Sequence, residues 1–168
     1  MKNFILFQLF FFILALNGCS VKEDFSVECV NDTITCISSP LFRIEADIPQ
    51  EAVLTLSHQN GRCAVFSHED YEITQEIFPA ASWDEAFLHV TGRNAEVLNP
   101  ILAGNFPQEE YRCSWSVAGE NGTELCQCTI LTDGTYYYAL SIQSDAKTDK
   151  AYTQTFSSLL ASVSLFAI

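Results

Sequence analysis

The chain has 168 residues, of which 48% are hydrophobic, and it carries 21 acidic against 8 basic side chains, a formal net charge of −13. This balance repels phosphate backbones, so we expect no nucleic-acid partner. Behind a short leader, the remaining length is that of one domain large enough to bury a core.

Residues 1–18 form the leader. Lys2 gives it a basic start, and the thirteen residues from Phe4 to Leu16 are apolar except for Gln8. A membrane-spanning helix needs about 18 or more apolar residues, so this shorter run is typical of a cleaved signal peptide. Its removal deletes one basic residue and leaves 21 acidic against 7 basic.

The leader ends in Leu16-Asn17-Gly18-Cys19, which resembles the lipobox of bacterial lipoproteins. There, the signal is cleaved before a cysteine whose thiol then carries lipid. The resemblance implies attachment to the outer face of a bacterial membrane through an acylated, palmitate-bearing Cys19, because buried acyl chains add their transfer energies. Ordinary cleavage after Ser20, followed by secretion, is the alternative.

The expected domain organisation follows from this cleavage. Residues 1–18 are the signal peptide, residues 19–27 the lipidated cysteine with a short polar tether, and residues 28–168 a single globular domain.

Six cysteines remain after Cys19 is lost to lipidation or cleavage. An even number in an exported chain predicts up to three disulfides. The six are Cys29, Cys36, Cys63, Cys113, Cys126 and Cys128.

The spacing of the six cysteines in the sequence limits which disulfides can form. Cys29 and Cys36 flank a turn-forming Asn-Asp dipeptide, so we expect them to pair. Cys126 and Cys128 point the same way on a strand and can hardly bond each other. We therefore expect one of these two to pair with Cys113 and the other with the remaining cysteine, Cys63.

Cys126-Gln-Cys128 could serve other chemistry. Zinc ligands are usually separated by two to four residues, and the three histidines show no motif spacing, so we expect no metal and no cofactor. A thiol–disulfide protein of the cell envelope working through Cys126 and Cys128 stays an alternative.

The first half of the domain has the alternation of strands and one well-marked helix. Ser82 and Glu85 form a capping box that opens the helix, and Gly92 ends it. The strands are expected at residues 41–48, 53–57, 62–67 and 71–78.

The second half reads as a meander of three strands, 111–117, 124–131 and 135–143, after a loop at 93–107 with at most one helical turn. If the four residues from Gly119 form the first hairpin loop, Cys113 lies opposite Cys128, whereas a two-residue turn at Asn121-Gly122 favours neither pairing.

A closing helix is expected at residues 149–165, with Thr148 as its N-cap and an apolar stripe toward the sheet. The fold class is therefore α+β, with a largely antiparallel sheet, a capped middle helix and a C-terminal helix packed on it, stabilised by disulfides. No catalytic motif is found, and we expect no enzyme.

The C-terminal end combines the run 134–143 (Gly-Thr-Tyr-Tyr-Tyr-Ala-Leu-Ser-Ile-Gln) with Tyr152-Thr-Gln-Thr-Phe156 and Leu160-Ala-Ser-Val163. This pattern resembles the end of Mog1/PsbP-like domains, whose bacterial members are often exported lipoproteins. The resemblance implies a non-catalytic α/β/α sandwich with no shared active site, so no site residues are carried over.

Other residues resemble an immunoglobulin-like domain. Tyr111-Arg-Cys113 has the spacing of a tyrosine corner, with Cys36 as a distant partner. Sequons at Asn31 and Asn121 would suit a secreted or cell-surface recognition domain of a eukaryote.

Tyr136, Tyr137 and Tyr138 form the most unusual local feature. If one face of their strand is exposed, they offer a stacking surface for a sugar or a peptide. Packing of all three within the sheet is the interpretation that we favour. The sequence predicts an envelope accessory that binds an unidentified protein, peptide or glycan partner.

Overall fold

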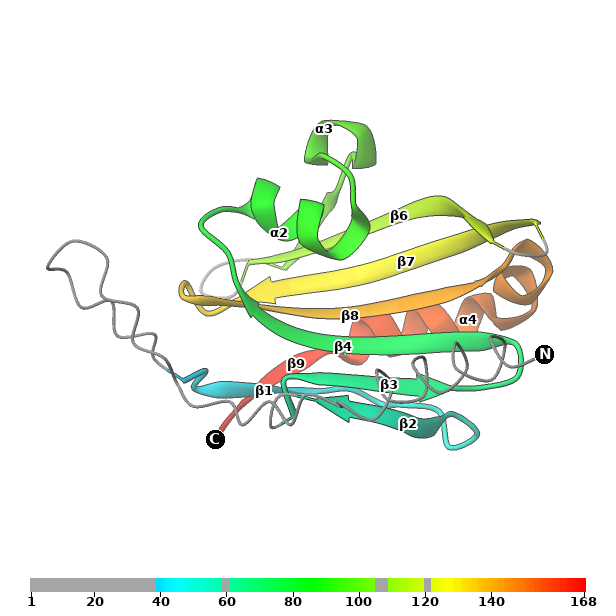
Figure 1. Ribbon diagram of the computed structural model, residues 1–168, viewed down its shortest axis with the longest axis horizontal. Coiled ribbons are helices and arrows are strands. Elements are labelled where there is room, and N and C mark those ends of the chain that lie inside the picture. Colours follow the sequence, from blue (N-terminus) through cyan, green and yellow to red (C-terminus); the bar gives the residue numbers. More distant parts are fainter. Residues whose placement is uncertain (1–38, 59–60, 105–108, 120–121) are drawn as a thin grey trace, which may run out of the picture. The chain divides into compact units, whose positions relative to one another are not determined.

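A seven-stranded antiparallel sheet with the order β2-β3-β4-β8-β7-β6-β5 forms the centre of the domain (Figure 1). The computed structural model describes residues 39–58, 61–104, 109–119 and 122–168, so the leader, the tether, Cys19, Cys29 and Cys36 lie outside the described residues. The strands are β2 (Val53–His58), β3 (Cys63–Ser67), β4 (Tyr71–Pro79), β5 (Ile101–Gly104), β6 (Glu110–Gly119), β7 (Gly122–Thr132) and β8 (Tyr136–Asp145).

Tight hairpins explain why neighbouring strands run antiparallel. β6 and β7 close with Gly119 opposite Gly122, where Gly122 has a φ of 137° that favours glycine. The register is the one expected for a loop that begins at Gly119, and it places Cys113 opposite Cys128. Between β7 and β8, the side chain of Asp133 accepts hydrogen bonds from the two backbone amides that follow Gly134.

Each face of the sheet is covered by a separate layer (Figure 1). On one face lie α2 (Trp83–Thr91) and α3 (Ala95–Leu98). On the other lie α4 (Ala146–Ser162) and a second, two-stranded sheet of β1 (Phe42–Glu45) with β9 (Ser164–Ala167). The expected α+β fold with helices packed on an antiparallel sheet is confirmed.

The ends of α2 follow the sequence pattern. The Ser82 hydroxyl accepts the Glu85 amide at 3.3 Å, and Gly92 ends the helix at a φ of 67°. The Glu85 carboxylate reaches back to the amide of Ala81 at 2.7 Å, one residue before the N-cap. The predicted capping box and glycine stop therefore fix this helix where expected.

The closing helix differs from its prediction. α4 begins three residues earlier than expected, because Asp145 at the end of β8 is the N-cap and accepts the amide of Thr148 at 2.7 Å. It ends at Ser162, since the chain then becomes β9 and pairs with β1. The residues 101–104, expected within a loop, form β5 at the sheet edge.

The immunoglobulin-like alternative is wrong. An immunoglobulin-like domain is a sandwich of two sheets. This domain has one large sheet, with α2 and α3 on one face and α4 with the small β1–β9 sheet on the other. Tyr111 instead packs against the core beneath α2. Its ring packs edge-on against Trp83 of α2 at 4.6 Å and against Phe87 at 5.8 Å. Asn31 and Asn121 lie outside the described residues.

In the part of the chain that the structure describes, no helix combines the length and the apolar character needed to span a membrane.

Candidate functional site

The four described cysteines lie on one face of the sheet, the face that carries α2. Cys113 and Cys128 belong to the core beneath α2, and Cys126 is two residues from Cys128 on the same strand, so it faces the same way. Cys63 on β3 is the cross-strand partner of Glu76 on β4 and shares its face. All four are thiols in this structure.

Cys113 and Cys128 are geometrically suited to form a disulfide. They are direct partners in the β6–β7 register, and their sulfur atoms are 3.2 Å apart. Directly opposed residues have Cα atoms about 4.5–5.5 Å apart, which falls within the range of about 4.4–6.8 Å that a disulfide needs. The hydrogen bond between the thiols lowers the pKa of Cys113 and raises that of Cys128.

Cys63 cannot reach the other described cysteines. β4 and β8 lie between its strand and β7, a lateral separation of about 14 Å at the usual strand spacing. The register from Cys63 passes through Ala139 on β8 and arrives at Ile130, not at Cys126 or Cys128. The expected pairing of Cys63 with one of these two is therefore wrong, because it would need Cα atoms within about 7 Å.

Cys126 and Cys128 are poorly placed for thiol chemistry. They are 3% and 0% exposed, and burial is the main reason that the pKa of Cys126 rises to about 11. A reactive cysteine is accessible and has a lowered pKa. This geometry disfavours the thiol–disulfide alternative.

The three consecutive tyrosines are core residues. Tyr136, Tyr137 and Tyr138 are 2%, 8% and 0% exposed, because β8 is a central strand with both of its faces covered. Tyr137 packs edge-on against Trp83 at 5.0 Å. Tyr138 donates its hydroxyl to Asp133 at 2.6 Å. The predicted stacking surface for a sugar or peptide is wrong.

A cavity of about 400 Å³ lies at the end of the sheet where β3 and β8 finish and β4 and β7 begin. It gathers residues from three segments far apart in the sequence: the β3–β4 turn, the start of β7 and the end of β8. Its lining is strongly acidic, with the carboxylates of Glu69, Asp70, Glu72, Glu124 and Asp145.

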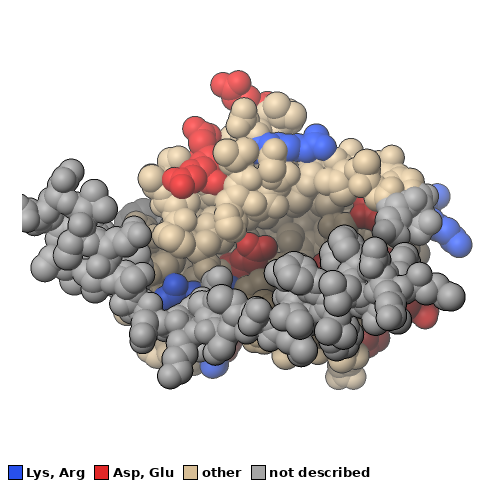
Figure 2. Space-filling model, viewed as in Figure 1, with Lys and Arg blue, Asp and Glu red and all other residues tan. Residues whose placement is uncertain are grey.

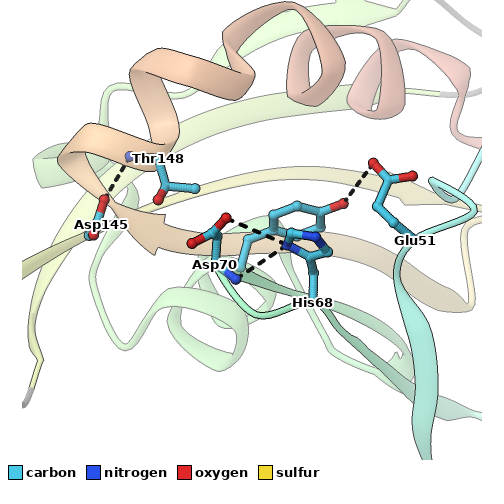
Figure 3. Close-up of polar contacts among 6 residues, drawn as sticks. Glu51, His68, Asp70, Asp145 and Thr148 are labelled. Atoms are coloured by element: carbon cyan, nitrogen blue, oxygen red, sulfur yellow. Dashed lines mark hydrogen bonds and ion pairs between the residues drawn. The ribbon is translucent and has the colours of Figure 1, made fainter.

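An aromatic pair, His68 and Tyr71, lines the β3–β4 side of this cavity, and Figure 3 shows His68 beside Asp70 at this turn. The His68 ring stacks on Tyr71 with centroids 4.5 Å apart, and its Nδ1 accepts the amide of Asp70 at 3.2 Å. In neutral imidazole the other nitrogen then carries the proton. Tyr71 donates its hydroxyl to Glu51 at 3.4 Å, and burial together with that carboxylate raises the Tyr71 pKa to about 12.

Two of the carboxylates have structural partners. Asp145 caps α4 through the Thr148 amide (Figure 3), and the hydrogen bonds from Thr148 lower the pKa of this carboxyl. Glu124 accepts a hydrogen bond from Gln143 of the neighbouring strand. Among the described residues no cluster of three or more ligands is arranged to hold a metal ion. The clustered carboxylates give this cavity a negative electrostatic potential.

The sequence did contain a signal for this cavity, the polar turn of residues 67–70 between two strands, but the convergence of the other two segments is visible only in the fold. Charge elsewhere is dispersed. Figure 2 shows acidic side chains over α2 and α3, where Asp84, Glu85 and Glu96 lie in the first helical turns, with basic side chains in small separate groups.

No protein-family model and no curated protein matches the chain. Among solved structures, the solution structure of cyanobacterial PsbP (CyanoP) from Synechocystis sp. PCC 6803 matches with a TM-score of 0.52 and 9% sequence identity, covering 82% of this chain and 97% of the other. The domain has a PsbP-like fold. At this identity the likeness concerns the fold alone, and it confirms the α/β/α arrangement that the C-terminal pattern implied.

Proposed function

We propose that this chain is an exported lipoprotein, held at the outer face of a bacterial membrane by an acylated Cys19 and acting by binding, as a non-catalytic envelope accessory. Residues 1–18 are removed as the signal peptide, and residues 19–27 tether the domain of residues 28–168. The PsbP-like fold supports an accessory role, since the implied family resemblance is to non-catalytic domains.

The position of Cys19 carries the proposal. It stands directly behind Gly18 at the end of the apolar run, and the eight residues 20–27 lead from it to the start of the proposed domain at residue 28. A tether of this length lets a folded domain stand clear of the bilayer surface. Two or more acyl chains on the cysteine would hold it there firmly.

The acid-lined cavity supports a cationic partner. The mature chain has a large acidic excess, and five carboxylates meet beside the His68–Tyr71 stack. A positively charged peptide or protein segment is the partner that such a surface attracts. The six mature cysteines include one pair, Cys113 and Cys128, that we propose forms a disulfide after export.

Metabolic labelling with radioactive palmitate tests the anchoring. The wild-type chain should take up label and sediment with membranes, and Cys19→Ala should lose both properties. Cys63→Ala is the matched control, since it removes a thiol of the domain and should keep the label. A Cys19→Ala chain that still sediments with membranes would overturn the proposal. An unlabelled, soluble wild-type chain beginning after Ser20 would favour plain secretion.

A further inference from the structure

β2 is an edge strand whose outer side has no partner among the described residues. The strand order places it at one end of the large sheet, where its described pairing is with β3 alone (Figure 1). In an antiparallel ladder, alternate residues of such a strand direct their backbone N–H and C=O groups away from the sheet. The outer side of β2 therefore offers a row of hydrogen-bonding groups to another strand.

The side chains of β2 do not block such pairing. All six residues from Val53 to His58 are exposed, and the strand holds no Asp, Glu, Lys, Arg or Pro. Edge strands are commonly protected by charged side chains or proline, which keep other strands away. Three large aliphatic side chains, Val53, Leu54 and Leu56, are exposed close together on this strand, so pairing would also remove apolar surface from water.

β2 contains an irregularity, a shift of register between Leu54 and Leu56. A bulge of this kind twists an edge strand and can weaken its pairing with another chain. Here the extra residue, Thr55, is held by β3. Its hydroxyl donates to the Val65 carbonyl at 3.2 Å and lies 3.0 Å from the Ser67 hydroxyl. The bulge is therefore fixed on the inner side of β2, and the outer side stays open.

The opposite edge of the sheet is less suited to pairing. β5 has four residues and is also irregular, between Leu102 and Gly104, and a very short edge strand is a usual form of protection. Pairing of β2 with β5 of another copy would leave a free edge at each end and would add copies without limit. Pairing of β2 with a second β2 closes on a two-fold axis.

Charge selects a second copy of this chain as the partner. The chain carries 21 acidic against 8 basic side chains, so most contacts between two copies would bring like charges together. Contact through β2 avoids this repulsion, because neither strand carries a charge. A foreign peptide would find no charged side chain on β2 to recognise, whereas a second β2 brings the same aliphatic side chains to both sides of the contact.

We propose that two copies of the chain pair through β2, antiparallel about a two-fold axis, so that their seven-stranded sheets join into one continuous sheet. The dimer covers Val53, Leu54 and Leu56 of both copies and satisfies the outward backbone groups of both edge strands. This inference does not depend on the lipid anchor, because it uses residues of the large sheet alone.

Sedimentation equilibrium over a series of protein concentrations tests the dimer. The mature protein is used, in density-matched detergent if it carries lipid and in buffer if it does not. The mass of the wild type should approach that of two chains as the concentration rises. Leu54→Lys should stay monomeric, because the dimer would desolvate its charge beside the same charge of the second copy.

Leu102→Lys is the matched control. It makes the same substitution on β5, at a leucine that is 52% exposed against 53% for Leu54, and it should dimerise like the wild type. A wild type that stays monomeric up to about 0.1 mM would overturn the proposal. So would dimers that persist in Leu54→Lys, or assemblies that keep growing beyond two chains.

Hydrogen exchange of the wild type gives a second measurement that needs no variant, should far-UV circular dichroism show that Leu54→Lys does not fold. The backbone amides of β2 should exchange more slowly at high than at low protein concentration, while those of β5 should be unaffected. Exchange of the β2 amides that does not change with concentration would contradict the dimer.

Discussion

Cys113 and Cys128 are direct partners across β6 and β7, with sulfur atoms 3.2 Å apart beneath α2. Oxidation would close a loop of 15 residues, which the chain-entropy model values at about 3 kcal/mol of stability. Urea unfolding with and without reductant should show a loss in the wild type that exceeds the loss in the Cys113→Ala/Cys128→Ala chain by about 3 kcal/mol. Equal losses in the two chains would show that this pair does not bond.

Thr129 joins α4 to the sheet. Its side chain is fully buried on β7, and its hydroxyl donates to the Leu160 carbonyl at 3.2 Å, in the last turn of α4, where helix carbonyls lack a helical partner. Thr129→Val keeps the shape but leaves that carbonyl without this donor, so the free energy of unfolding should fall by about 1–2 kcal/mol. Chemical denaturation of both chains measures this difference in the free energy of unfolding.

Thr153→Val is the control for that experiment. Thr153 is exposed on α4, and its hydroxyl returns to the carbonyls of its own helix, so its loss should change stability by less than about 0.5 kcal/mol. Equal effects of the two substitutions would contradict a special role for the buried hydroxyl.

The raised pKa of the Tyr71 hydroxyl should make the folded state less stable at alkaline pH. Its pKa in the folded state is about 12, whereas an unfolded tyrosine titrates near 10, about two units lower. At a pH between these two values, unfolding releases the Tyr71 proton. The stability that this hydroxyl contributes to the folded state is therefore complete below about pH 10 and is lost as the pH rises toward 12. Urea unfolding from pH 9 to 12 should show a shallower decline for Tyr71→Phe than for the wild type. Parallel declines would contradict the shift.

The acid-lined cavity should bind cations more strongly than other acidic surface does. Glu69→Gln/Glu72→Gln should weaken binding of a tetralysine peptide about threefold in low salt, and high salt should abolish the difference. Asp84→Asn/Glu96→Gln removes the same charge from α2 and α3 and should have a smaller effect in calorimetry. Equal weakening by both double variants would reduce the cavity to part of a general negative field.

Local signals predicted those elements whose ends are fixed by neighbouring residues. Ser82, Glu85 and Gly92 delimit α2, and each acts through atoms within a few residues. The start of α4 could not be chosen in this way, because Asp145 and Thr148 are both good capping residues. β8 runs directly into the helix and leaves Asp145 at the junction.

Features that depend on pairing between residues far apart in the sequence could not be predicted from the sequence. β9 pairs with β1, more than a hundred residues earlier in the chain, so its first two residues, Ser164 and Leu165, were assigned to the end of a helix. Packing of the tyrosine run was the favoured interpretation, but a binding surface stayed open because strand periodicity cannot tell whether the second face is covered. Likewise, whether Cys63 can reach Cys126 or Cys128 depends on the strand order, which places β4 and β8 between them.

The most direct test of the central claim is the intact mass of the native protein extracted from its membrane and treated with a thiol-alkylating reagent without reductant. A chain that begins at Cys19, carries the added mass of acyl chains and, when denatured, takes up fewer alkyl groups than its six remaining cysteines would allow is the predicted result. A chain that begins at Met1, has no lipid and is alkylated at all seven cysteines would contradict the account.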